Sequence, residues 1–350
     1  SVSLSGAQVS LKGVALGGAG FAGLLAAVQN LPAGVSIGAN DVIPAAASPY
    51  VFSVARNNTG IELRGFAPSE AVLNGLVAAA KKAAGPDGRV TNNLQYASGA
   101  ARNFEARALY GAGLVGRLKQ GVFELDGDTA SLKGVAPDSV SFEALRSEMT
   151  SLPHGLKAGT ISLTPPVSQS YSFSVARNGG QIVLSGSISA PRLRSELNGV
   201  AKGLPAITSV EDRLTYASGA PDKFEQIAKA GVTIAGRLQA GRFSYINGKV
   251  SVSGEAADSA TYEQIRKELL ALPGGVDAAS NAVVPPAADV FGFEVAKTAQ
   301  ALVLGGQVPS ADVRQALAAA ARSAAPGLQV EDKLVFASGA PDNFQALAQY

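Results

Sequence analysis

The stretch FSVARNGGQIVLSG, residues 173–186, carries the pattern on which the predicted fold depends. Apolar side chains stand at every second position on both sides of Asn178-Gly179-Gly180, at Phe173 and Val175 and at Ile182 and Leu184, as they do in strands that bury one face. Asparagine followed by glycine favours a tight hairpin turn, because both residues adopt a positive φ at low cost. The stretch therefore predicts a β-hairpin whose second strand ends at Gly186.

The hairpin belongs to a tandem repeat. The sequence FSVARN at 173–178 also stands at 52–57, and the related FEVAKT stands at 293–298. Ala-Ser-Gly-Ala occurs at 97–100, 217–220 and 337–340, so successive copies are 120 residues apart. Because several independent markers keep one period, we expect three tandem units of about 120 residues.

Each unit is divided into two related halves. A strand that ends in glycine occurs six times, at Gly13, Gly65, Gly134, Gly186, Gly254 and Gly306. The gaps between these glycines are 52, 69, 52, 68 and 52 residues, so shorter and longer connections alternate. In the longer gaps, residues 104–118 and 224–238 are expected to form an additional helix.

A helix is expected after the hairpin in each half. Serine or aspartate stands four residues after four of the six glycines, at Ser69, Asp138, Asp258 and Ser310. These short side chains can accept hydrogen bonds from the free amides of a helix's first turn. The following segment, for example 260–272, is amphipathic and stops at Leu-Pro, and an alternating strand such as 210–216 comes next. Each half therefore predicts strand, turn, strand, helix and strand.

The expected fold class is α+β, in which one unit has a mixed sheet of about six strands covered by about three helices. The expected domains are residues 1–101, 102–221 and 222–350, each a pair of halves. The first is expected to be truncated at its N-terminus, and the third to include the start of a following helix at 342–350.

The composition argues against several functional classes. The 29 basic and 27 acidic residues give a net charge of +2 without any basic run, which does not suit a nucleic-acid-binding surface. Cysteine is absent, which excludes disulfides and thiolate chemistry. No run of 18 apolar residues could cross a membrane as a helix. No cluster of acid, base or nucleophile recurs in all three copies, so we expect neither enzymatic activity nor a cofactor.

Basic side chains recur at two positions of the repeat, and they are the candidate surface contacts. Arg56, Arg177 and Lys297 belong to the hairpin, whereas Arg117 and Arg237 stand in Gly-Arg-Leu after the additional helix. One interpretation is a series of cationic contacts to phosphate or carboxylate groups. The other, which we favour, is that these residues are ordinary solvated ends of strands and helices.

Two further positions are weighed against metal binding. His154 is the sole histidine and follows Leu-Pro, so we expect it to be a turn residue without ligand partners. Asp212 and Asp332 each follow a glutamate and share the parity of their strand's apolar face. Adjacent strand residues point to opposite faces, so solvated strand ends near Arg213 or Lys333 explain these paired carboxylates better than a metal ion does. A helix amide or an arginine partner would explain the parity of the two aspartates.

The hairpin with its terminal glycine, the capped helix and the closing strand resemble the BON family (bacterial OsmY and nodulation domains). The glycine of that pattern corresponds to Gly65, Gly134, Gly186, Gly254 and Gly306, which are expected to be structural. The 120-residue unit, with its phrase Ala-Ser-Gly-Ala-Pro-Asp, is similar to the periplasmic region of alphaproteobacterial OmpA-family proteins. The resemblance brings no catalytic residues with it.

The resemblance implies a non-enzymatic cell-envelope protein, located in the periplasm or at the outer membrane. Such a chain would act as a spacer and bind a phospholipid surface or envelope proteins. Peptidoglycan would be bound through a domain outside this chain, and nucleic acid is not an expected partner. The alternative is a self-assembling structural or adhesive protein that forms a filament or coat. Exposed edge strands or apolar patches shared between copies would favour that alternative.

Overall fold

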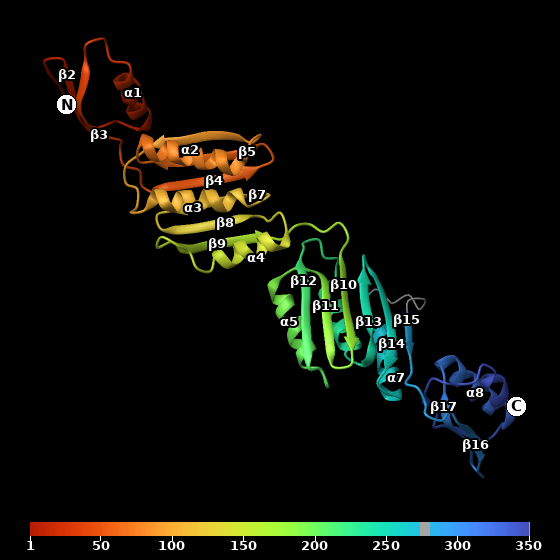
Figure 1. The fold of residues 1–350 in the computed structure, drawn as a ribbon. Helices are drawn as coiled ribbons and strands as arrows, with labels where there is room; N and C mark the ends of the chain where they lie inside the picture. The colour runs from red at the N-terminus through yellow and green to blue at the C-terminus, as the bar shows by residue number, and fades with distance from the viewer. Residues whose placement is uncertain (274–280, 350) are drawn as a thin grey trace. The chain divides into compact units, whose positions relative to one another are not determined.

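The computed structural model describes residues 1–273 and 281–349, and these residues form an α+β fold with several mixed sheets and nine helices (Figure 1). The chain divides into two compact units, Ser1–Pro166 and Val167–Tyr350. Each unit contains one six-stranded sheet and one smaller sheet. The expected fold class is therefore confirmed at this level.

The first unit consists of thirteen elements in the order that the repeat predicts. They are β1 (Val2–Ser5), β2 (Gln8–Val14), α1 (Gly18–Gln29), β3 (Ser36–Ile43), β4 (Val51–Asn57), β5 (Gly60–Ala67), α2 (Glu70–Ala84), β6 (Arg89–Tyr96), α3 (Phe104–Gly116), β7 (Gln120–Asp126), β8 (Thr129–Val135), α4 (Ser139–Glu148) and β9 (Lys157–Thr164).

From β10 to β15 the second unit repeats the order of β4 to β9. Its elements are β10 (Ser172–Asn178), β11 (Gln181–Ile188), α5 (Pro191–Lys202), β12 (Ser209–Tyr216), α6 (Phe224–Ala235), β13 (Leu238–Ile246), β14 (Lys249–Ala256), α7 (Ser259–Leu270), β15 (Asn281–Val284), β16 (Phe293–Lys297), β17 (Ala301–Val308), α8 (Ala311–Ala324), β18 (Gln329–Asp332), β19 (Val335–Phe336) and α9 (Phe344–Ala348). The additional helices α3 and α6 thus end two to three residues before the expected ends at 118 and 238.

Each six-stranded sheet joins two half-repeats through their hairpins. The strand order is β6-β5-β4-β7-β8-β9 in the first unit and β12-β11-β10-β13-β14-β15 in the second. The central strands β4 and β7 pair antiparallel, as do β10 and β13, whereas the outer strands β6, β9, β12 and β15 pair in parallel with their neighbours. In the first unit α2, α3 and α4 lie over one face of the sheet (Figure 1).

The expected domain boundaries at 101/102 and 221/222 are wrong, because they are displaced by one half-repeat from the ends of the sheets. They fall between β6 and α3 and between β12 and α6, inside the two six-stranded sheets. The complete sheets comprise residues 51–164 and 172–284, while 1–43 and 293–336 form smaller sheets of three and four strands. The physical reason is that α3 leads into β7, which returns antiparallel to β4, so the long connection joins two halves of one sheet.

The phenylalanine that follows each Ala-Ser-Gly-Ala phrase is a core anchor. Phe104 packs edge to face against Tyr50 and Phe52, with ring centroids 5.1 and 5.9 Å apart. Phe224 makes the same contacts with Tyr171 and Phe173, at 4.7 and 5.9 Å. Phe344 does so with Phe291 and Phe293, at 5.0 and 5.7 Å. The helix start is thereby fixed against the first hairpin strand in all three copies.

Local signals in the sequence account for the helix ends. The expected N-caps are confirmed, because the side chains of Ser69, Asp138, Asp258 and Ser310 each accept a hydrogen bond from the amide three residues later. Within α3, a Cβ on Gly111 would lie 2.2 Å from the ring of Phe123, and in α6 one on Gly231 would lie 2.5 Å from Phe243. These glycines therefore allow the helix to pack closely on the central strand.

Candidate functional site

Arg56 and Arg177, two of the candidate contacts, hold helix ends. The Nη1 atom of Arg56 donates to the carbonyl oxygens of Ala83 and Gly116, both at 2.9 Å, in the last turns of α2 and α3. Arg177 donates in the same way to the carbonyl of Gly236 at the end of α6. A cation is favourable at a helix C-terminus, where carbonyls lack intrahelical partners. Neither guanidinium is presented as a free binding group.

Burial accompanies this role in the second unit. Desolvation holds the pKa of the Arg177 guanidinium below its ordinary value. Its Nε also donates to the carbonyl of Gly179, at 2.9 Å, which fastens the hairpin turn to the helix end. The favoured expectation of solvated strand ends is therefore wrong for Arg56 and Arg177, because both are partly buried and bonded to backbone.

Lys297 is different from its two counterparts. It lies exposed on β16, and within the described part of the chain its ammonium group makes no hydrogen bond or ion pair. No helix carbonyl of the described residues accepts a hydrogen bond from it, unlike Arg56 and Arg177.

Arg117 and Arg237 form ion pairs with the neighbouring helix. Nη1 of Arg117 lies 2.8 Å from Oε1 of Glu148 on α4, and Nη2 of Arg237 lies 2.9 Å from Oε1 of Glu268 on α7. All four side chains are partly exposed, so each pair contributes at most about 1 kcal/mol. These arginines connect the end of the additional helix to the helix of the following half-repeat.

The five candidate structural glycines stand where two strands approach too closely for a side chain. A Cβ atom would come within 2.2–2.6 Å of a carbonyl oxygen on the neighbouring strand. Four of the five also have φ between 92° and 138°, which side-chain-bearing residues rarely adopt. The members of this set are Gly65, Gly134, Gly186, Gly254 and Gly306, and Gly134 is the one without a positive φ.

The two aspartates weighed as metal ligands have arginine partners. Oδ2 of Asp212 accepts from Nε of Arg194 at 2.8 Å, and Oδ2 of Asp332 accepts from Nε of Arg314 at 2.8 Å. Burial raises the pKa of Asp212, but hydrogen bonds from Arg194, the Leu214 amide and Asn198 lower it more, so the net pKa lies below its usual value. Each aspartate thus has the arginine partner that would explain its parity, whereas Arg213 and Lys333 pair with Glu211 and Glu331, so the favoured expectation of solvated strand ends is wrong for the two aspartates. Among the described residues no group of three or more His, Cys, Asp or Glu could hold a metal ion.

Sequence reasoning missed Arg107, which is the buried charged residue of the described chain. Arg107 is a buried residue of α3, and its guanidinium donates to the carbonyls of His154 at 3.0 Å, Gly127 at 3.3 Å and Gly155 at 3.4 Å. The histidine itself has φ 57° in a turn, which agrees with its expected role. The sequence contains a signal for its burial, because the corresponding positions of the other two copies hold the apolar residues Ile227 and Leu347.

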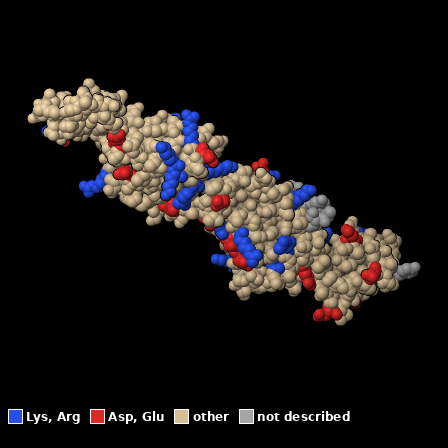
Figure 2. Space-filling view, turned by 45° about the horizontal axis from the view of Figure 1, so that its top comes forward, with Lys and Arg blue, Asp and Glu red and all other residues tan. Residues whose placement is uncertain are grey.

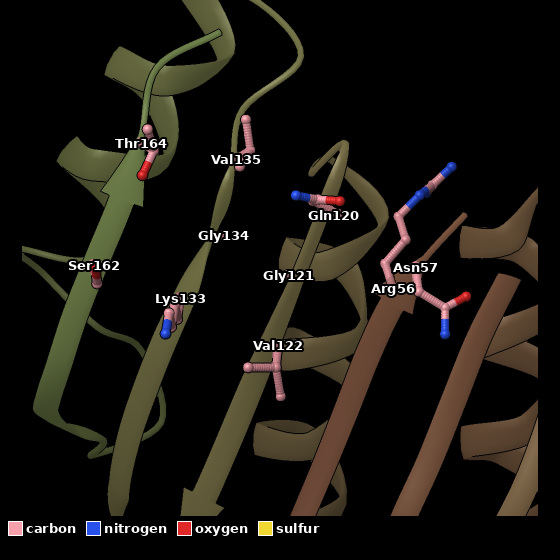
Figure 3. A pocket seen from close by; sticks show the side chains of 10 residues that line it. All are labelled: Arg56, Asn57, Gln120, Gly121, Val122, Lys133, Gly134, Val135, Ser162 and Thr164. Carbon is pink, nitrogen blue, oxygen red and sulfur yellow. The ribbon is translucent and has the colours of Figure 1, made fainter. Parts of the chain in front are cut away.

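A hollow of about 420 Å³ lies on the sheet of the first unit, at the ends of β4, β7, β8 and β9 (Figure 3). Gly121 and Gly134 form its floor, because paired glycines leave the backbone uncovered. Its polar side chains include Gln120, Lys133 and Ser162, and no carboxylate lines it. In the second unit Ala240, Ser253 and Ala282 occupy these positions, so the lining does not recur.

Within each unit, an aromatic contact connects the six-stranded sheet to the smaller sheet. Phe21 of α1 packs edge to face on Tyr96 of β6, with centroids 5.2 Å apart. Tyr262 of α7 packs on Phe336 of β19, at 5.1 Å. Ser259 Oγ also accepts from the backbone amide of Phe336 at 2.7 Å. Sequence reasoning missed these junctions, although Phe21 and Tyr262 stand at the same place after their helix starts.

Figure 2 shows several basic side chains close together near the centre of the view, with acidic side chains beside them, while most of the visible area is uncharged. No helix in the described ranges combines the length and apolar character that crossing a bilayer requires.

No protein-family model matches the chain, and comparison with curated proteins and with solved structures finds no match either.

Proposed function

We propose that this chain is a non-enzymatic repeat protein of the cell envelope, located in the periplasm or at the outer membrane, where it acts as a spacer that binds envelope proteins. The finer fold assignment belongs to the same proposal: six BON-like halves in tandem, of which residues 51–164 and 172–284 form two pairs, while 1–43 and 293–336 are single halves. The main support for the proposal is one observation. The side-chain contacts that recur from copy to copy connect helices and strands of this chain to one another.

Three repeated features support a structural role. Phe104 and Phe224 anchor a helix on a hairpin, Arg56 and Arg177 bind helix ends, and the strand glycines permit close pairing. The aromatic contacts Phe21–Tyr96 and Tyr262–Phe336 connect neighbouring sheets. Repeat proteins derive their stability from such nearest-neighbour interfaces and leave their outer surfaces available to partners.

The contacts of the arginines favour proteins over lipid as partners. A lipid surface would be recognised by free cationic groups, and their attraction would be screened by salt. Arg56 and Arg177 are bonded to backbone, and Arg117 and Arg237 are paired with carboxylates. Among the five candidate contacts, Lys297 alone has a head group without a described partner.

Co-sedimentation separates the two kinds of partner. The chain would be incubated with protein-free vesicles of graded anionic lipid content, and with outer-membrane fragments of an alphaproteobacterium, at low and at physiological salt. We expect it to stay in solution with the vesicles and to sediment with the fragments, and to lose this binding after the fragments are treated with protease. Salt-sensitive sedimentation with anionic vesicles would identify lipid as the partner instead. Failure to bind either would contradict the proposal.

A further inference from the structure

The 420 Å³ hollow of the first unit is a trough on the uncovered face of its six-stranded sheet. On the other face, Phe123 packs against α3 and Leu132 is fully buried. Successive strand residues point to opposite faces, so Val122 and Lys133 point away from the helices. The trough therefore lies on the face opposite α2, α3 and α4, and we call this the open face (Figure 1).

Strand pairing gives the trough its shape (Figure 3). Arg56, Gly121 and Gly134 stand in one row across β4, β7 and β8, and the two glycines leave the backbone of this row uncovered. The neighbouring rows carry the side chains of the open face, so the trough runs across the strands between two rims. One rim is Val122, Lys133 and Ser162, and the other is Gln120, Val135 and Thr164.

The charge of the trough is positive. Its lining contains Arg56 and Lys133 and no carboxylate. Nη1 of Arg56 donates to helix carbonyls, and its guanidinium points away from Lys133 in Figure 3, so it adds positive charge without being the contact group. The Lys133 side chain is exposed, and among the contacts of the described residues its ammonium group has no hydrogen bond or ion pair. A negatively charged ligand would therefore meet Lys133.

Neutral donors surround this cation. Ser162 stands directly opposite Lys133 on β9, and paired strands lie about 4.8 Å apart, so both side chains reach one anionic group. Oδ1 of Asn57 already accepts from the amides of Thr59 and Gly60, at 2.9 and 3.1 Å, which leaves its NH2 group to a ligand. The remaining polar side chains of the lining are the exposed Gln120 and Thr164.

We propose that the trough binds a small organic phosphate, of the class of sugar phosphates. A phosphate group carries up to two negative charges and three acceptor oxygens, which suits a compact ammonium group beside hydroxyl donors. The phosphate contacts Lys133 and Ser162, and the hydroxyl-bearing remainder extends along the trough toward Gln120 and Asn57. The volume of about 420 Å³ is sufficient for such a molecule. This inference goes beyond the spacer function and does not depend on it.

The second sheet offers an internal comparison, because it keeps the floor of the trough and changes the lining. Gly241 and Gly254 pair directly, as the two floor glycines of the first sheet do. Glu255 introduces a carboxylate where the first sheet has Val135. The donors Lys133, Gln120 and Ser162 are replaced by Ser253, Ala240 and Ala282. The second sheet should therefore not bind the same ligand.

The test is a titration of the full ¹⁵N-labelled chain with glucose 6-phosphate, followed by NMR. We expect saturable shifts of the backbone amide signals of Gly121 and Gly134 and of the side-chain amide of Asn57. The signals of Gly241 and Gly254 should stay in place in the same spectra. Inorganic phosphate should bind more weakly, and glucose should cause no shift.

Lys133→Ser introduces the residue that the second sheet has at this position, so the fold should tolerate it. We expect it to weaken glucose 6-phosphate binding by at least about tenfold, because a charge-assisted contact is lost. The matched control is Lys157→Ser. It removes an exposed cation at the start of β9, outside the trough, and should leave the affinity unchanged.

Four results would overturn the proposal. Equal shifts at Gly241 and Gly254 would indicate unspecific binding, and equal affinities of Lys133→Ser and Lys157→Ser would remove the charge contact. An affinity for inorganic phosphate as high as that for glucose 6-phosphate would show that the rest of the trough holds nothing. Loss of the Gly121 and Gly134 signals on phosphatidylglycerol vesicles, without a response to glucose 6-phosphate, would assign the trough to a lipid headgroup. Co-sedimentation with membrane fragments is measured separately, so failure here leaves the spacer function standing.

Discussion

Nε of Arg314 lies 2.8 Å from Oδ2 of Asp332, and Nη1 of the same guanidinium lies 2.7 Å from Oε1 of Glu263. The guanidinium also stacks over the ring of Phe336, 5.2 Å from its centroid. Asp332 belongs to the same sheet as Phe336, whereas Glu263 comes from α7. One side chain thus connects a strand end, an aromatic ring and the helix of the preceding half-repeat.

Arg314→Ala is therefore expected to weaken the junction between the last two sheets. It removes charge-assisted bonds to two partly buried carboxylates, and we expect the free energy of unfolding to fall by about 1–3 kcal/mol. Urea denaturation followed by circular dichroism measures the change. Arg322→Ala on the exposed side of the same helix α8 is the control, and an equal loss in both variants would refute the role of the junction.

Arg56→Ala is expected to lower stability without changing the partition to membranes. Two carbonyls at helix ends lose their donor, which costs about 1–3 kcal/mol. The measurement is again urea denaturation, together with vesicle co-sedimentation. The matched control is Arg64→Ala. The Arg64 side chain is exposed and its described ion pair is with Glu62, two residues earlier in the chain, so the free energy of unfolding should change little. A loss of vesicle binding with unchanged stability would instead support the cationic-contact interpretation.

Local structure could be predicted from the sequence because it depends on residues close together in the chain. The cap at Asp258, the hairpin turn at Gly179-Gly180 and the helix start at Phe224 each follow from a few neighbouring positions. The arginine partner of Asp212 could also be anticipated, because a carboxylate on the apolar face of a strand requires a donor.

Pairing of the halves could not be predicted, because a repeat has no unique starting point. The same periodicity allows residues 51–96 to pair with the half before or after it, and the choice follows from the antiparallel pairing of β4 with β7. The role of Arg56 was hidden for a related reason. Its acceptors Ala83 and Gly116 lie 27 and 60 residues away, and they meet only after two helices have packed.

The strand glycines give a sharp test of close packing. A Cβ on Gly65 would lie 2.2 Å from the carbonyl oxygen of Val51, and its φ is 105°. Gly65→Ala is thus expected to destabilise the first unit by about 2–5 kcal/mol, from steric overlap and backbone strain. Gly113→Ala is the control, because this helical glycine has open space around it and alanine should stabilise α3 by about 0.5–1 kcal/mol. Thermal unfolding of both variants distinguishes the two cases, and similar shifts would contradict the argument.

Asp212 predicts a specific pH dependence. Its folded pKa is depressed, because the bonds from Arg194, Leu214 and Asn198 outweigh the effect of burial. Its stabilising contribution is therefore complete above the unfolded pKa of about 3.9, and it is lost as the pH falls through the lower folded pKa. Asp212→Asn removes the charge but keeps an oxygen for the Leu214 amide, as Asn92 does for Leu94 in the first unit at 3.1 Å. We expect the variant to be less stable than wild type at pH 6 and the difference to shrink toward pH 2, measured by urea midpoints across that range. Because other carboxylates titrate equally in both proteins, the difference isolates Asp212, and a gap that stays constant with pH would show that its charge contributes nothing to the fold.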